Sequence, residues 1–154
     1  MERTAQFAPW AGRNGRLIAM ATVVRPAAQM RTMRIEDLGV VSAMEAASYE
    51  FPWSIGIFAD CLKTGHPCWV LCMGTAIAGY AILSVGAGEA HLLNICIDPG
   101  YRGQGLGRYL LGRMLDIARW NGAERLFLEV RPSNPLATKS RFSRMVRSSQ
   151  YENR

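Results

Sequence analysis

The chain has 154 residues, a formal net charge of +6 and a hydrophobic fraction of 49%. A chain of this length suits one domain with one core, and all its apolar runs are shorter than the roughly 18–20 residues of a membrane-spanning helix. We therefore expect a single folded domain in the cytoplasm, with no membrane as partner.

The excess positive charge lies at the two ends of the chain. Residues 1–34 hold six arginines and one glutamate, and residues 138–154 hold four arginines, one lysine and one glutamate. Residues 35–137 hold seven basic and ten acidic residues. Because no basic stripe runs through the periodic segments, we expect no direct reading of nucleic acid. Basic ends could still hold the protein near an RNA-rich partner, with solvated ends that have no partner as the alternative.

The first half of the chain predicts one strand followed by two helices. Residues 29–35 are predicted to form the strand. Residues 36–48 predict an amphipathic helix, since apolar spacing there is near-helical; the positions concerned are Leu38, Val41, Met44 and Glu45. Pro52 ends that helix because proline cannot continue it, and Ser54 is a suitable N-cap for a second helix over 55–65.

Three strands and a further helix follow. Residues 67–74 and 75–86 predict two strands around a tight turn at Gly74–Thr75, and residues 89–99 predict another. The next helix, over 106–120, has the clearest apolar face, formed by Leu110, Leu111, Met114, Leu115 and Ala118.

Asn121-Gly122 stops this helix, and residues 125–130 predict a fifth strand. The order β-α-α-β-β-β-α-β predicts an α/β fold with a mixed sheet.

A glycine-rich loop joins the strand over 89–99 to the helix over 106–120. Glycines occupy positions 103, 105 and 107, between Arg102 and Arg108. The first amides of a helix lack acceptors, and glycines let the backbone come close to a phosphate. We therefore expect this loop to hold a diphosphate, with a purely structural glycine turn as the alternative.

Two common phosphate-binding loops do not fit this segment. A Walker loop needs lysine and then serine or threonine after its last glycine, whereas Gly107 is followed by Arg108 and Tyr109. The dinucleotide loop has the spacing Gly-x-Gly-x-x-Gly and follows the first strand of its domain, whereas this loop follows the fourth. The remaining pattern, Arg/Gln-x-x-Gly-x-Gly/Ala, is matched in full by residues 102–107.

That pattern resembles the pyrophosphate loop of the GNAT superfamily of acetyltransferases. Together with Phe-Pro-Trp-Ser at 51–54 and Leu-Glu-Val-Arg-Pro-Ser-Asn at 128–134, it makes the sequence over about residues 30–137 resemble the RimI-type ribosomal-protein alanine N-acetyltransferases. The resemblance implies an acetyltransferase domain over 28–137, with a mixed sheet flanked by helices, after a basic extension over 1–27. It also implies acetyl-CoA as co-substrate, no metal, and the N-terminal amine of a ribosomal protein as acceptor.

The resemblance also assigns roles to single residues. The backbone of the strand before the loop would pair with the pantetheine arm, which implies Ile95, Cys96 and Ile97. The pyrophosphate contacts fall on Arg102, Gly103, Gln104, Gly105, Leu106, Gly107 and Arg108, and a further cofactor contact falls on Asn134. Glu129 matches the general base of the family.

Glu129 can also be judged from its own surroundings in the sequence. It alternates with Phe127 on one face of a largely apolar strand, where a carboxylate is costly unless it is exposed, paired or used. An α-amino group, with a pKa near ~8, needs only a modest base to become nucleophilic. The alternative is a strand-end glutamate paired with Arg125 or Arg131.

The cysteines predict no disulfide framework, because they show no Cys-x-x-Cys spacing; they are Cys61, Cys68, Cys72 and Cys96. We expect reduced, buried thiols, with a zinc site that includes His66 or His91 as the alternative. A nucleophilic role for Cys96 is not expected, since neither a helix N-terminus nor a histidine partner is evident.

The resemblance ends after Ala137. The family continues with a helix that carries a Leu-Tyr-x-x-x-Gly-Phe pattern, whose tyrosine is the proposed general acid, and then two more strands; Arg141 stands at the tyrosine position. Residues 138–154 show no strand alternation, so we expect a divergent or truncated end that lacks the last two strands. The hypotheses that stay open are an Nα-acetyltransferase, an acetyl-CoA-binding relative with little catalysis, and an acetyltransferase of lysine or a small amine.

Overall fold

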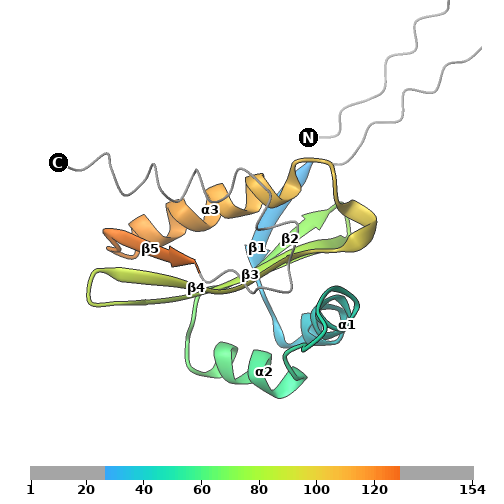
Figure 1. Ribbon diagram of the computed structural model, residues 1–154, viewed down its shortest axis with the longest axis horizontal. Coiled ribbons are helices and arrows are strands. Elements are labelled where there is room, and N and C mark those ends of the chain that lie inside the picture. The colour runs from blue at the N-terminus through green and yellow to red at the C-terminus, as the bar shows by residue number, and fades with distance from the viewer. Residues whose placement is uncertain (1–26, 129–154) are drawn as a thin grey trace, which may run out of the picture.

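The protein, studied as a computed structural model, is described over residues 27–128 (Figure 1). The strands are β1 (Ala28–Thr32), β2 (Cys68–Met73), β3 (Ala76–Gly86), β4 (Glu89–Ile97) and β5 (Arg125–Leu128). The helices are α1 (Leu38–Ser48), α2 (Ile55–Lys63) and α3 (Leu106–Trp120), with 3-10 turns at Ile35–Asp37 and Pro99–Tyr101. Glu129, Asn134, Arg141 and most of the predicted terminal segments lie outside the described residues.

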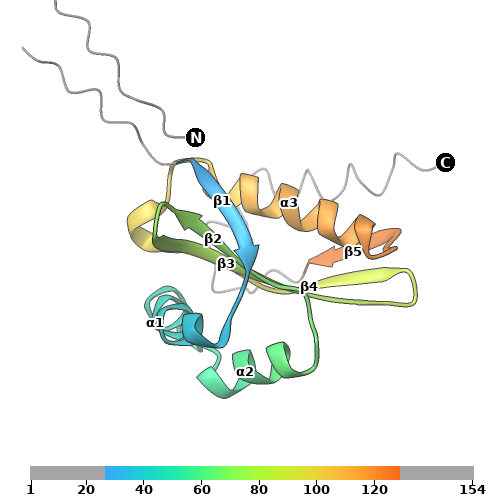
Figure 2. The same ribbon diagram turned by 180° about the vertical axis from the view of Figure 1, so that it is seen from behind.

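The strands form one sheet in the order β1-β2-β3-β4-β5. The first four are antiparallel to their neighbours, and β5 runs parallel to β4. Helix α3 covers one face of the sheet, while α1 and α2 lie against the other (Figures 1 and 2). The predicted α/β class, element order and mixed sheet are therefore confirmed.

Element bounds differ from the prediction where local hydrogen bonds intervene. Helix α3 has the predicted limits, and Gly122 stops it with a left-handed φ of +81°. The helix predicted from residue 36 begins at Leu38, because the Asp37 carboxylate accepts the Arg34 N–H at 2.8 Å within a 3-10 turn. Ser54 is the N-cap residue of α2, but its hydroxyl makes no capping hydrogen bond.

Each face of the sheet has its own apolar core. Against α3 the fully buried side chains include Leu110, Leu111 and Met114, each contributing about 1.5–3 kcal/mol by burial. Leu115, predicted for the same face, is half-buried. The core beneath α1 and α2 includes Phe58 and all four cysteines. All four cysteines are free and buried, as predicted.

Strand β4 changes phase at a bulge. Leu83 pairs with Leu92 while Ile82 pairs with Asn94, so Leu93 has no partner on β3. One extra residue moves all later side chains of a strand to the opposite face. Leu92 consequently packs toward α3, whereas Asn94 and Cys96 face α1.

An ion pair fixes the chain between β1 and α1. Two nitrogens of the Arg31 guanidinium lie 2.7 and 2.8 Å from the two carboxylate oxygens of Asp37, which is buried. The hydrogen bond from Arg31 holds the pKa of Asp37 below its usual value, and burial opposes this shift.

Asp37→Asn is expected to lower the free energy of unfolding at pH 7 by about 1–2 kcal/mol, because it removes a charge-assisted pair. The pKa of Asp37 is lower in the folded than in the unfolded chain. Its contribution is therefore complete above the unfolded-state pKa and disappears as the pH falls through the folded-state value. Urea unfolding of both chains at pH 7 and in acid checks this: the difference should close in acid, and a constant difference would contradict it.

Candidate functional site

The loop between β4 and α3 has a backbone that requires glycine at two positions. Gly103 and Gly105 are both left-handed, with φ values of +76° and +80°, and Gly105 is the N-cap residue of α3. A Cβ at either position would meet nothing within 4 Å. The glycines are therefore needed for conformation, and open space lies where their side chains would project.

The start of α3 can bind an anion. Its first helical bond runs from the Tyr109 N–H to the Gly105 carbonyl at 3.1 Å, so the N–H groups of Leu106, Gly107 and Arg108 have no acceptor within the helix. The helix dipole adds positive potential at this end, and the first turn holds no acidic residue. Arg108 is exposed in that turn and adds a full charge. Together these groups can hold a diphosphate.

The side chain of Arg102 forms its hydrogen bonds with groups outside the glycine loop. Its Nε donates to the Ile97 carbonyl at 3.0 Å, and its Nη2 donates to the Ser48 hydroxyl at 2.9 Å. The guanidinium thus connects the end of β4 to the last turn of α1. The sequence did not reveal this side-chain direction. Because the guanidinium bonds to Ile97 and Ser48, Arg102 can offer an anion at the loop only its peptide group and the longer-range attraction of its charge.

The second half of β4 has an open edge. The Asp98 N–H donates to the Ala78 carbonyl at 2.9 Å, so by the alternation of an antiparallel ladder the peptide groups of Cys96 also face β3. Those of Ile95 and Ile97 then face the opposite side. There, within the described residues, β5 pairs with β4 only as far as Leu92.

Two side chains occupy the carbonyls on this open edge. The Ile95 carbonyl accepts the Tyr49 hydroxyl at 2.6 Å, and the Ile97 carbonyl accepts Nε of Arg102. The N–H groups of Ile95 and Ile97 bond to no residue in the described part of the chain. Of the three predicted pantetheine contacts, Ile95 and Ile97 therefore offer outward donors, and Cys96 contributes its peptide groups to the ladder with β3.

The Cys96 thiol lies in the core beneath α1. Its Sγ is 3.2 Å from the Ser48 hydroxyl, and burial raises the pKa of the thiol. A thiol with a raised pKa forms little of the thiolate that a nucleophile needs. His91 is exposed and stacks on Phe127, with ring centroids 5.0 Å apart. The buried position of the thiol agrees with the expectation that Cys96 is not a nucleophile.

Glu45 was predicted only as a position on the apolar face of α1, without a functional role. It is fully buried, and its Oε1 accepts the Trp53 N–H at 3.0 Å. Its Oε2 accepts the Tyr80 hydroxyl and, at 3.2 Å, the Asn94 amide. Burial raises the pKa of Tyr80, so its hydroxyl keeps the proton it donates. The sequence does contain a signal for this buried carboxylate, namely an acidic residue among the apolar positions of a helix.

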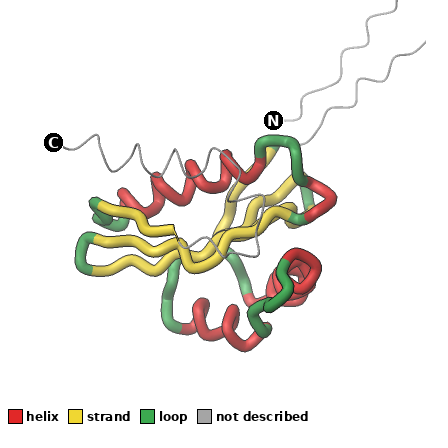
Figure 3. The backbone as a smooth tube through the Cα atoms, viewed as in Figure 1, coloured by secondary structure: helices red, strands yellow, loops and turns green. Residues whose placement is uncertain are grey.

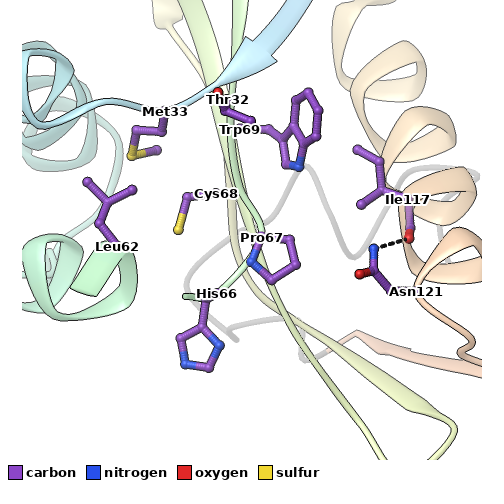
Figure 4. Close-up of a pocket in the computed structure, with 9 residues that line it drawn as sticks. All are labelled: Thr32, Met33, Leu62, His66, Pro67, Cys68, Trp69, Ile117 and Asn121. Carbon is purple, nitrogen blue, oxygen red and sulfur yellow. Dashed lines mark hydrogen bonds between the residues drawn. The ribbon is translucent and has the colours of Figure 1, made fainter. Parts of the chain in front are cut away.

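The structure also contains a pocket that includes no residue of the glycine loop (Figure 4). It lies where β1 ends and β2 begins, next to the last turn of α3, and is lined by Thr32, Met33, Leu62, His66, Pro67, Cys68, Trp69, Ile117 and Asn121. The Asn121 amide bonds to the Ile117 carbonyl at 2.7 Å, so it serves the helix end. Ile117 lies roughly 18 Å along α3 from Gly105, so this pocket is separate from the glycine loop.

Within residues 27–128, no helix is long and apolar enough to cross a membrane. The same residues contain no group of three or more histidine, cysteine, aspartate or glutamate side chains that could hold a metal ion.

Comparison with known sequences identifies the family. The profile described as "Acetyltransferase (GNAT) family" matches residues 28–139. The chain is 37% identical over 106 residues to the ribosomal protein bS18-alanine N-acetyltransferase of Escherichia coli, a match that covers 69% of this chain and 72% of that protein. The corresponding enzyme of Salmonella typhimurium is 36% identical over 101 residues, covering 66% and 68%.

Solved structures agree with the sequence comparison. The crystal structure of the ribosomal-protein-S18-alanine N-acetyltransferase from Escherichia coli matches with a TM-score of 0.68 at 32% identity, covering 81% of this chain and 77% of that one. Ard1 from Thermoplasma volcanium has the same fold, with a TM-score of 0.70 at 23% identity over 77% of this chain and 80% of that one. The family match spans well over half of the chain and includes β4, the glycine loop and α3. The chain therefore belongs to the GNAT family of acetyltransferases.

Proposed function

We propose that this protein transfers the acetyl group of acetyl-CoA to the α-amino group of an N-terminal alanine of a ribosomal protein, in the cytoplasm. The observation that carries the proposal is the continuous row of donors formed by β4, the glycine loop and α3. A chain that contains this row is also similar, over two thirds of its length, to enzymes that acetylate the alanine of ribosomal protein bS18.

Acetyl-CoA has groups that match this row of donors. Its diphosphate would accept from the amides of the loop over Gly103–Arg108, helped by the charge of Arg108. Its pantetheine arm would lie along the open edge of β4 and accept from Ile95 and Ile97. Asn134 would contact the cofactor further along. Bound in this way, acetyl-CoA supplies a thioester carbonyl as the acetyl donor.

The reaction then needs a neutral amine. Glu129 directly follows Leu128, the last residue of β5, and Leu126 and Leu128 pack toward α3. Continued alternation would put Glu129 on the same side as Phe127, near the bulge of β4. There its carboxylate would take a proton from the α-ammonium, directly or through a water. The amine nitrogen would bond to the acetyl carbon and lose its second proton to solvent, the carbon–sulfur bond would break, and the thiolate would take a proton from water or another group.

A second candidate function is binding of acetyl-CoA with little or no turnover. It is favoured by Arg141, which stands where the related enzymes are expected to carry a tyrosine acid, and by the composition of residues 138–154. Lysine or a small amine as acceptor is the remaining alternative for an active enzyme.

Mass spectrometry of acceptor peptides decides among these functions. The full chain would be incubated with acetyl-CoA and a peptide with an N-terminal alanine and one internal lysine. The matched control is the same peptide with its α-amine blocked. We expect one added acetyl group, on the α-amine, and no product from the blocked peptide. Product on the lysine would contradict the proposed acceptor, and no product from protein that binds acetyl-CoA would favour the binding-only function.

A further inference from the structure

We propose that Glu45 is a positioning residue for the acceptor amine. By this proposal, its carboxylate fixes the connection between α1 and α2, residues 49–54, beside the open edge of β4. The inference rests on the proposed acetyl transfer, because it concerns how the amine meets the thioester. It assigns to Glu45 a role separate from that of the base, Glu129.

The carboxylate of Glu45 is held by donors from three separate parts of the fold. They are the Trp53 N–H in the connection, the Tyr80 hydroxyl on β3 and the Asn94 amide on β4. No lysine or arginine of the described residues forms an ion pair with it. Burying a carboxylate without a countercharge costs folding free energy. We therefore infer the role of Glu45 from the groups that it connects and not from a contribution to stability.

The last turn of α1 follows β4 residue by residue. Glu45 contacts Asn94, Tyr49 donates to the Ile95 carbonyl, and Ser48 contacts the thiol of Cys96. The next contact is from Ser48 to Arg102, at the start of the glycine loop. In Figure 3, α1 and the loop into α3 lie at the same end of the sheet. The connection that leaves this turn therefore starts beside the open edge of β4, where the pantetheine arm is proposed to lie.

The side of the sheet on which this connection lies favours the acceptor over the cofactor. The proposed diphosphate site is at the start of α3, which covers one face (Figures 1 and 2). An amine must reach the same carbonyl from a direction that the cofactor leaves free. On the α1 side, Tyr49 at the start of residues 49–54 donates to the Ile95 carbonyl, and Phe51 in the same segment is 75% exposed. This segment can thus form a wall against which an acceptor peptide lies.

Aromatic packing supports the connection independently of the carboxylate. The Trp53 ring lies 5.4 Å from that of Phe58, and Phe58 meets Tyr80 edge-on at 5.5 Å. The Tyr80 hydroxyl returns to Glu45, which closes a ring of contacts. Altering the carboxylate alone should therefore shift the connection without unfolding the domain.

Glu45→Gln and Tyr80→Phe are the test variants, and Asp37→Asn is the matched control. Asp37 is also a buried, hydrogen-bonded carboxylate, but it lies before α1, at the far end of that helix from Glu45. We expect both test variants to raise the KM for the alanine peptide about 5- to 20-fold, while the Kd for CoA stays within about twofold. The control should leave both constants unchanged. An equal rise in KM in the control would reduce Glu45 to a structural role and overturn the proposal.

Hydrogen exchange gives a second readout that needs no turnover. Glu45→Gln should speed exchange of the amides in residues 49–54, above all that of Trp53, and leave those of α3 unchanged. Asp37→Asn should speed exchange only around residues 34–38. Unaltered exchange over 49–54 in Glu45→Gln overturns the positioning role. Absence of transfer by the unaltered chain, with the exchange result as expected, would instead reject the proposed function alone.

Discussion

Glu129→Gln is expected to lower kcat for acetylation of the alanine peptide about 100-fold or more, since a positioned base contributes at least that factor. Glutamine has the shape of glutamate but cannot accept the proton of the α-ammonium. The Kd for CoA should not change, because Glu129 is not among the proposed cofactor contacts, which come from β4, the loop, α3 and Asn134. Steady-state kinetics and calorimetric titration with CoA measure the two quantities separately.

Glu124→Gln is the matched control, since Glu124 is an exposed glutamate just before β5. It should retain full activity. The rate left in Glu129→Gln should rise with pH as the α-amine, with a pKa near ~8, deprotonates by itself. Equal rates in Glu129→Gln and the control would remove Glu129 from the mechanism and favour its pairing with a neighbouring arginine.

Gly105→Ala is expected to raise the Kd for CoA by about tenfold or more. Alanine at a φ of +80° is strained by about 1–2 kcal/mol, which favours a changed loop. Its Cβ would also enter the open space beside the loop that the diphosphate is proposed to fill. Each effect alone approaches a factor of ten in binding, since about 1.4 kcal/mol corresponds to that factor. Titration with CoA measures the change.

Gly65→Ala separates the loss of the site from backbone strain. Gly65 follows α2, has a φ of +79° and also has open space around its Cβ position. The two variants should lose similar amounts of unfolding free energy, yet Gly65→Ala should bind CoA normally. If both variants bound CoA equally well, the loop would be a structural turn and no cradle for a diphosphate.

Local features of the fold were predictable from the sequence. Helix α3 was predicted with its observed bounds because its apolar period, its glycine N-cap and its terminal glycine all lie within one short segment. The position of the glycine loop between a strand and a helix N-terminus was predictable by the same local reasoning, whereas the left-handed conformation of Gly103 and Gly105 was not part of the prediction. The glycine loop identified the family for the same reason, since its pattern is contiguous.

Features that depend on contacts distant in sequence were not predictable. The bulge at Leu93 appears only when β4 is aligned with β3, because the residues of β4 read by themselves do not reveal an unpaired position. The direction of Arg102 depends on Ser48, which is 54 positions away. The donors around Glu45 come from residues 53, 80 and 94, which no short pattern joins. Glu129 and Asn134 stay predictions.

The bulge at Leu93 makes the length of β4 a functional constraint. Deleting one residue there would turn the strand over from that point on: the Asn94 amide would leave Glu45, and Cys96 would exchange places with its neighbours. The peptide groups of Ile95 and Ile97 would turn inward to β3, and the open edge would lose its donors. Substitutions at this place alter single contacts, whereas a deletion would exchange the inside and the outside of half a strand. The count of residues between Leu92 and the glycine loop is thus as much a part of the site as their identity.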